Sequence, residues 1–221
     1  EKETLNQWIT EGKVNAPFGS TDRVVILTVG DSANYVAGHI PGSVFLDRNA
    51  LNQTRIDGVG SITNMVPSGT NVDNILQNAG IDKYTTIVLV AHKSTVTPAD
   101  ANNYYTGRAY YVMRYWGIPK ERIKMLNGGT DAYATAYTID TASVSVSPST
   151  FSVKNLYKGS LANFSFKTSI GQMIGLVRNW TSSSTYNIFD CRGTTNWNTA
   201  HLTGSIAVDA DNNLVTGTTF K

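Results

Sequence analysis

The sequence predicts an α/β protein with a parallel sheet flanked by helices, arranged as one complete domain and the beginning of a second. Strand-like runs alternate with helix-like runs along the chain. Two of the strand runs, RVVILTV at 23–29 and TIVLVA at 86–91, are almost wholly apolar and do not alternate polar with apolar residues. Because strands buried on both faces have this composition, the pattern indicates a parallel sheet with helices on both sides.

Each expected element has its own local signal. Apolar residues at helical spacing identify the helices, and Gly12 and Gly80 stand where two of them should end. Short β-branched runs between turn residues identify the strands. In chain order, the expected elements are a helix at 5–12, strands at 23–29 and 43–47, a helix at 71–80, a strand at 86–91, a helix at 104–116, a strand at 122–126 and a short helix after Gly128-Gly129.

The pattern stops and then starts again. Residues 139–160 begin with a Ser- and Thr-rich stretch that lacks helical periodicity, which is typical of an interdomain linker. A helix is expected next at 169–180 and an apolar strand at 186–190. The sequence therefore predicts a first domain at 1–138, a linker at 139–160 and the first part of a second domain at 161–221.

An internal repeat supports this division. Shifting the chain by 162 residues aligns 27–47 with 189–209 without a gap. His39 then matches His201, and Gly42-Ser43 matches Gly204-Ser205. The last residue, Lys221, corresponds to position 59, so the second unit ends early in the pattern of the first.

Composition excludes several classes of protein. With 41% hydrophobic residues the chain can bury a core, and a net charge of +2 without a basic cluster argues against nucleic acid as a partner. No apolar run is long enough for a membrane span. The single cysteine excludes an intrachain disulfide. Ser, Thr and Asn make up 65 residues, so we expect an exported protein, periplasmic or extracellular.

Several short motifs resemble those of the rhodanese family of sulfurtransferases. Residues 35–43, YVAGHIPGS, resemble the conserved "Y-x-x-G-H-I-P-G-A/S" loop. The passage from Gly107 to Trp116, followed by MLNGG at 125–129, resembles part of the tandem-domain thiosulfate sulfurtransferases. In the second unit, Asp190-Cys191-Arg192 resembles the "D-x-R" that ends a rhodanese strand, and AHLTG at 200–204 is a degenerate form of the loop.

Most of these motif residues have structural roles. Gly38 and Gly42 permit backbone angles closed to other residues, and Pro41 fixes φ within the turn. We interpret His39 as a hydrogen-bonded loop histidine, because neither it nor His201 has acidic or cysteine neighbours at metal-ligand spacing. The remaining positions assigned to the structural motif are Gly128, Gly129, Asp190 and Gly204. No metal and no cofactor is expected.

The resemblance also implies where the catalytic group should be. Rhodanese chemistry uses a cysteine thiolate that follows the strand equivalent to 87–90, and this chain has Ala91 there. The first unit also has Thr28-Val29-Gly30 in place of "D-x-R". We therefore expect a non-catalytic first domain, and no catalytic residue is assigned within the chain.

Four basic side chains are candidates for binding an anion: His92, Lys93, Arg108 and Arg192. A solvated surface charge is the alternative for Lys93 and Arg108, and an ion pair with Asp190 is the alternative for Arg192. Cys191 aligns with the strand residue Val29, so we expect it to be a small buried residue.

The resemblance implies a parent sulfurtransferase that moves sulfane sulfur from thiosulfate or a polysulfide to a thiophilic acceptor. The alternative is an inactive rhodanese-like binding or scaffold protein at the cell surface or in the periplasm. A third reading, a phosphatase-like anion site, lacks the same cysteine. The expected partners are the remainder of the second domain, or another chain that completes it, and a small sulfur-containing anion.

Overall fold

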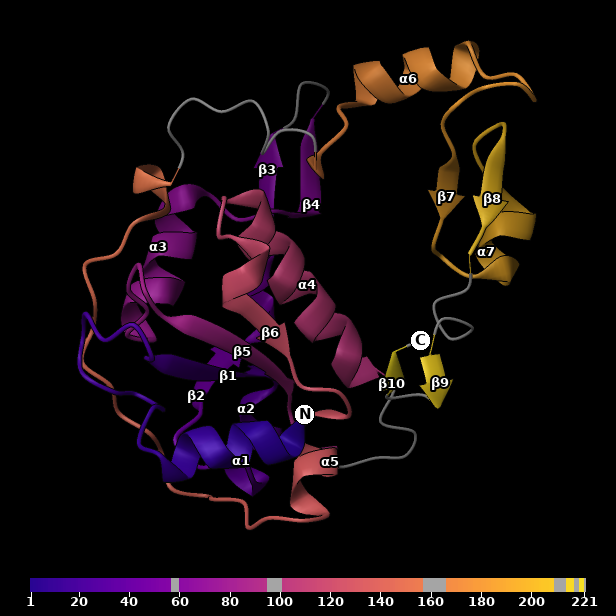
Figure 1. Ribbon diagram of the computed structural model, residues 1–221. Helices are drawn as coiled ribbons and strands as arrows, with labels where there is room; N and C mark the ends of the chain where they lie inside the picture. The colour runs from indigo at the N-terminus through magenta and orange to yellow at the C-terminus, as the bar shows by residue number, and fades with distance from the viewer. Residues whose placement is uncertain (57–59, 95–100, 157–165, 209–213, 217–218, 221) are drawn as a thin grey trace. The chain divides into compact units, whose positions relative to one another are not determined.

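A computed structural model describes residues 1–56, 60–94, 101–156, 166–208, 214–216 and 219–220 (Figure 1). The chain forms two compact units, one of residues 1–163 and one of residues 164–221. The first unit is built around a four-stranded sheet, and the second contains a two-stranded pair with its own helices.

The sheet of the first unit is parallel throughout, which confirms the predicted fold class. Its strands are β1 (Val24–Gly30), β2 (Val44–Asp47), β5 (Thr86–Ala91) and β6 (Ile123–Met125). Their order across the sheet is β2-β1-β5-β6. β1 pairs with β5 from Val24 opposite Thr86 to Val29 opposite Ala91. The carboxyl ends of β1 and β5 therefore lie side by side, at one edge of the sheet.

Alternate residues of β1 and β5 face two separate cores. Val25, Leu27 and Val29 pack with α3 (Gly69–Asn78) and α4 (Ala101–Tyr115). Val24 and Ile26 pack on the opposite face with α1 (Lys2–Thr10) and α5 (Gly129–Ala134). Figure 1 shows the two helix pairs on the two sides of the sheet. Because both faces are covered, the central strands carry few polar side chains.

Some elements differ from those expected. The helix predicted at 71–80 begins earlier, because the Ser68 side chain accepts a hydrogen bond from the Asn71 backbone and caps it. An antiparallel hairpin of β3 (Gln53–Ile56) and β4 (Ser61–Met65) was not expected. The short helix α2 (Ser32–Ala37) was not expected either. Single 3₁₀ turns lie at η1 (Arg48–Leu51), η2 (Lys120–Arg122) and η3 (Val153–Asn155).

The described part of the expected linker packs onto the first unit. His39 and Asp140 exchange two backbone hydrogen bonds, at 2.8 and 2.7 Å. Phe151 and Val153 are buried in the core formed with α3 and α4. The carboxylate of Asp73 in α3 accepts hydrogen bonds from the Ser152 hydroxyl and the Val153 N–H. Residues 139–156 therefore belong to the packing of the first unit, and 157–160 lie outside the described residues.

The second unit contains α6 (Ile170–Arg178), β7 (Ile188–Asp190), α7 (Thr194–Thr199) and β8 (Ser205–Ala207), followed by β9 (Leu214–Thr216) and β10 (Thr219–Phe220). Ser169 and Gln172 form a capping box at the start of α6, where the helix expected at 169–180 begins. Within the described residues, no helix has the length and apolar character needed to cross a membrane.

Candidate functional site

A histidine turn joins α2 to β2 in the first unit. His39 is fully buried and its ring stacks on the ring of Tyr35, with centroids 3.8 Å apart and planes 6° from parallel. The His39 Nδ1 lies 2.9 Å from the Tyr35 carbonyl oxygen, and Nε2 lies 3.0 Å from that of Ala142. The Tyr35 hydroxyl donates to the carbonyl of Ser43. This histidine therefore connects its own turn, residues 35–43, with the segment that contains Ala142.

The same turn occurs in the second unit, 162 residues later. His201 stacks on Trp197 with centroids 3.9 Å apart and planes 11° from parallel. Its Nδ1 lies 2.8 Å from the Trp197 carbonyl oxygen. The Trp197 indole N–H donates to the hydroxyl of Ser205. Gly204 has a φ of 78°, and Gly42 at the equivalent place has 76°.

The strands around the turn repeat with the same register. Leu27 of β1 is opposite Val44 of β2, and the equivalent Phe189 of β7 is opposite Ile206 of β8. The helices α2 and α7 also begin and end at equivalent residues, since 32–37 becomes 194–199 under the shift. The same local fold therefore occurs twice in the chain.

Ala91 ends β5 at the carboxyl edge of the first sheet, and it is only 4% exposed. Its carbonyl oxygen accepts a hydrogen bond from the Thr130 hydroxyl. Gly129 lies so close that a Cβ added to it would be 2.8 Å from the Cβ of Ala91. The Gly128-Gly129 pair therefore lets the start of α5 approach the end of β5, and Ala91 has no room around it.

His92 fills the space where the first unit lacks an arginine. It is 2% exposed, and a Cβ added to Gly30 would lie 2.3 Å from the Cγ of its ring. The His92 Nδ1 is 2.9 Å from the side-chain nitrogen of Asn34 and 3.3 Å from the backbone N–H of Asp31. His92 was a candidate for anion binding, but the structure places its ring inside the protein, against the end of β1.

A polar cluster that the sequence did not indicate lies beside His92. The guanidinium of Arg48 pairs with the carboxylate of Asp31, with Nε and Oδ1 2.7 Å apart. It also donates to the Tyr105 hydroxyl and lies over the Tyr105 ring. The Tyr105 ring in turn meets the His92 ring edge-on. The available signal was position, because Arg48 directly follows β2 at the same edge as the ends of β1 and β5.

The loop after β5 already holds a carboxylate. Both carboxylate oxygens of Asp131 in α5 accept from the Ser94 N–H, at 3.1 and 3.2 Å. In a persulfide site, N–H groups of such a loop would face the sulfur anion. Here the Ser94 N–H donates to the Asp131 carboxylate instead. Residues 95–100 lie outside the described residues, and the helix expected at 104–116 begins earlier, at Ala101.

Two other candidate side chains are engaged elsewhere. Arg108 donates from Nε to the Leu51 carbonyl and from Nη2 to the Asn64 carbonyl, so it braces η1 and β4. Burial lowers the pKa of its guanidinium. The stem of Lys93 lies over Gly38, since a Cβ there would be 3.3 Å from its Cδ. Arg108 thus uses two of its nitrogens to hold backbone carbonyls, and anion binding by Arg108 or Lys93 stays a prediction.

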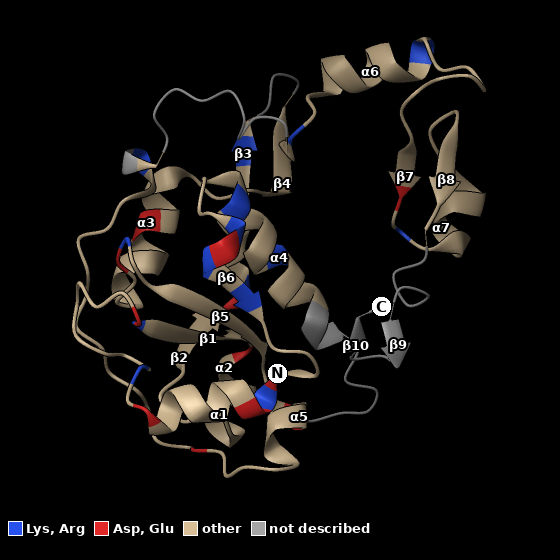
Figure 2. Cartoon of the chain, viewed as in Figure 1, with Lys and Arg blue, Asp and Glu red and all other residues tan. Residues whose placement is uncertain are grey.

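In the second unit, Arg192 forms the ion pair that was its alternative reading. Its Nη2 lies 2.6 Å from Oδ2 of Asp190 and also donates to the carbonyl of Ala200. The hydrogen bond from Arg192 lowers the pKa of the Asp190 carboxyl to about 2. Asp190, Arg192 and His201 line an open pocket of about 570 Å³, together with Cys191. At the end of β7, where Figure 2 shows an acidic and a basic residue close together, this unit thus has an ion pair whose equivalent positions in the first unit are Thr28 and Gly30.

We expect the Asp190 carboxyl to titrate near pH 2 in the folded protein, against an ordinary value of 3.8. Because the folded value is the lower one, any stabilisation from this pair is present above about pH 3.8 and is lost as the pH falls toward 2. Carbon-13 NMR of the side-chain carboxyls measures the midpoint. Arg192→Gln should return it toward 3.8, and an unchanged midpoint in that variant would contradict the assigned cause.

Cys191 is exposed, which corrects the expectation that it is a buried strand residue. The strand β7 ends at Asp190, one residue earlier than the alignment with Val29 implied. The Cys191 thiol therefore lies after the strand, in the pocket beside Arg192.

A thiol reagent should consequently label Cys191 in the native protein at nearly the rate found in denaturant. Absorbance of the released chromophore follows the reaction, and a Cys191→Ser variant gives the blank. If labelling of the native protein were about a hundredfold or more slower than in denaturant, the thiol of Cys191 would be buried and this prediction would be contradicted.

Among the described residues, no three His, Cys, Asp or Glu side chains are grouped in a way that could hold a metal ion. No family model and no curated protein matches the chain.

Solved structures do match. An anaerobic ergothioneine biosynthesis enzyme from Chlorobium limicola, in complex with trimethyl histidine, has a TM-score of 0.69 and 18% identity, over 100% of this chain and 54% of that one. SseA from Escherichia coli, described with the rhodanese fold of 3-mercaptopyruvate sulfotransferases, has a TM-score of 0.68 and 18% identity, over 100% and 77%. EanB carrying a cysteine persulfide has a TM-score of 0.66 and 17% identity, over 100% of this chain and 54% of that one.

At these identities the likeness shows the fold alone, which is rhodanese-like. The chain spans about half the length of the Chlorobium limicola enzyme.

Proposed function

We propose that this chain, with its rhodanese-like fold, forms the non-catalytic amino-terminal part of a sulfurtransferase. In this proposal, the complete enzyme transfers sulfane sulfur from a donor such as thiosulfate or a polysulfide to a thiophilic acceptor. The observation that carries it is the local fold that occurs twice, with the Asp190–Arg192 pair present only in its second copy. The first copy has Gly30 where the second has Arg192, and His92 fills that space.

The solved structures support sulfur chemistry for this fold. One neighbour is described as a 3-mercaptopyruvate sulfotransferase, and another holds a cysteine persulfide with ergothioneine. A sulfurtransferase needs a thiolate that accepts sulfur from the donor and passes it to the acceptor. Ala91 supplies none, so the proposal assigns the nucleophile to the strand of the second domain that corresponds to β5.

Exposed apolar residues in the second unit support a partner that completes it. Phe189 is 58% exposed, whereas the equivalent Leu27 in β1 is fully buried under α3 and α4. Ile206 in β8 is 47% exposed. Large apolar side chains at this level of exposure on a sheet mark an interaction surface. We propose that the remainder of a second rhodanese-like domain, or another chain equivalent to it, covers this face.

The test is a sulfur-transfer assay on the full-length protein that contains this chain. Thiosulfate and 3-mercaptopyruvate are offered as donors and cyanide as the acceptor, and thiocyanate is measured. The first variant replaces by serine the cysteine that follows the strand of the second domain corresponding to β5, and it should abolish turnover. The variant Cys191→Ser should leave turnover unchanged. Inactivity of a full-length protein that carries this cysteine would favour the inactive binding or scaffold protein. Loss of activity in Cys191→Ser would move the nucleophile to this chain.

Export remains part of the proposal because of the Ser-, Thr- and Asn-rich composition. Fractionation of the source cells would decide it, since a cytosolic location contradicts a periplasmic or extracellular one.

A further inference from the structure

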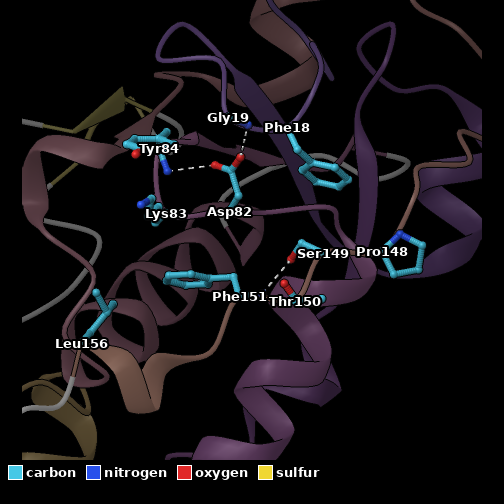
Figure 3. A pocket seen from close by; sticks show the side chains of 10 residues that line it. All are labelled: Phe18, Gly19, Asp82, Lys83, Tyr84, Pro148, Ser149, Thr150, Phe151 and Leu156. Carbon is cyan, nitrogen blue, oxygen red and sulfur yellow. Dashed lines mark hydrogen bonds between the residues drawn. The ribbon is translucent and has the colours of Figure 1, made fainter.

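A second pocket lies at the amino-terminal edge of the first sheet, opposite the edge where Ala91 ends β5. It measures about 590 Å³ and belongs wholly to the first unit. Its wall is formed by the loop before β1, the turn before β5, and the segment after Pro148 that lies along the unit. Figure 3 shows the side chains of Phe18 and Phe151 around it, with Tyr84 across from them.

Each of the three aromatic rings has a cation beside it. The Arg23 guanidinium carbon lies 4.6 Å from the centroid of Phe18, and that of Arg122 lies 5.7 Å from the centroid of Phe151. The Lys83 ammonium lies 4.6 Å from the centroid of Tyr84. Phe18 and Tyr84 are each more than 40% exposed. Of the three cations, Lys83 lines the pocket, whereas Arg23 and Arg122 lie against two of its aromatic rings without lining it.

The two arginines are held in place by backbone carbonyls. Arg23 is 3% exposed, and its Nε and Nη2 both donate to the carbonyl of Gly80. Arg122 donates from Nε to Thr85 and from Nη2 to Asp82. Among the described residues, neither guanidinium has a carboxylate within ion-pair distance. Burial lowers the pKa of both groups. An anion nearby would offset this cost of burying positive charge.

The pocket also contains one carboxylate, that of Asp82, whose charge acts on both guanidinium groups and raises their pKa against the larger effect of burial. Asp82 accepts hydrogen bonds from the N–H groups of Gly19, Tyr84 and Thr85 and from the Thr85 hydroxyl. Burial alone would raise the pKa of this carboxyl, but the hydrogen bonds outweigh burial and lower it. Asp82 is therefore a fixed part of the turn before β5, and its single negative charge stands against the positive charges of Lys83 in the pocket wall and of Arg23 and Arg122 behind two of the rings.

We propose that this pocket binds a small organic anion, a carboxylate on an aromatic or branched apolar body. The apolar body packs against Phe18, Tyr84 and Phe151, and the carboxylate faces Lys83 at the mouth, within the field of the two arginines. The charge excess selects an anion over a neutral or cationic analogue of the same shape. This site is independent of sulfur transfer, because it lies at the other edge of the sheet.

Three probes of one shape test the proposal on the complete chain: 3-phenylpropanoate, 3-phenylpropanamide and 3-phenylpropylamine. Calorimetry and ¹H–¹⁵N NMR titration should show saturable binding of the carboxylate, with shifts at Gly19, Tyr84 and Phe151. We expect the amide to bind at least about tenfold more weakly than the carboxylate, which corresponds to about 1.4 kcal/mol, and the amine to bind more weakly than the amide. Added salt should weaken the binding of the carboxylate and leave the binding of the amide unchanged.

Variants locate the site. Lys83→Gln should weaken carboxylate binding several-fold and leave amide binding unchanged, whereas Phe18→Ala should weaken both. Lys124→Gln removes the same charge from an exposed position of β6 outside this pocket, and should change neither. Equal affinity for carboxylate and amide would overturn the selection for an anion. Tighter binding of the amine, no binding, or shifts elsewhere would each overturn the proposal itself.

Discussion

The 221-residue chain should form no thiocyanate from thiosulfate and cyanide above a Cys191→Ser control. Sulfur transfer requires a thiolate that carries the sulfur between donor and acceptor, and the first unit has Ala91 at that position. Colorimetric detection of thiocyanate measures the rate. Robust turnover that survives Cys191→Ser would contradict the non-catalytic assignment of the first unit.

Ala91→Cys alone should not create activity either. Ala91 is 4% exposed and lies against Gly129, so a thiol there would be buried away from donors. The Asp131 carboxylate already accepts from the Ser94 N–H, and its charge would oppose both a thiolate and an anionic donor. Thiosulfate turnover by this variant, matched for folding by circular dichroism, would show that the edge is more open than the structure has it.

His39→Ala should cost the first unit about 3 kcal/mol or more of unfolding free energy. The substitution removes a fully buried ring, its stack on Tyr35, and its bonds to the Tyr35 and Ala142 carbonyls. It leaves a cavity, and the Ala142 carbonyl loses the ring nitrogen that it contacts, whereas the Tyr35 carbonyl still accepts from the Gly38 N–H. The cavity and the lost contact together account for a loss of about this size. Urea unfolding, monitored by hydrogen exchange of the backbone amides in β1 and β5, measures this loss of unfolding free energy.

His201→Ala is the matched control that the repeat provides. His201 makes the equivalent stack and the equivalent bond to Trp197, but its side chain is exposed. We expect a loss below about 1 kcal/mol, confined to hydrogen exchange in the second unit. Equal losses at the two histidines would mean that burial does not set the strength of this turn.

The sequence predicted the strands of the first sheet well because burial on both faces leaves a continuous apolar run. The run at 86–91 became β5 with the same ends. The hairpin of β3 and β4 was missed because it is largely exposed, and its residues, such as Gln53 and Arg55, have no apolar period. The Ser- and Thr-rich composition of the segment expected as a linker did not reveal that Phe151 and Val153 enter a core.

The candidate site could be predicted only where one short segment contains it. The histidine turn and the Asp190–Arg192 pair span nine residues or fewer, and motif resemblance located them. Arg48 was missed because one of its partners, Tyr105, lies 57 residues away along the chain. Cys191 was misplaced because alignment with Val29 assumed a strand of equal length, and β7 is shorter than β1.

The contact between His92 and Gly30 constrains the order in which substitutions can accumulate at this edge. With the His92 ring 2.3 Å from where a Cβ would stand, position 30 tolerates no side chain until His92 has changed or moved. An arginine there would have to displace a buried ring. The effect of any side chain at position 30 therefore depends on which residue occupies position 92, so a change at His92 has to come before a larger residue at position 30.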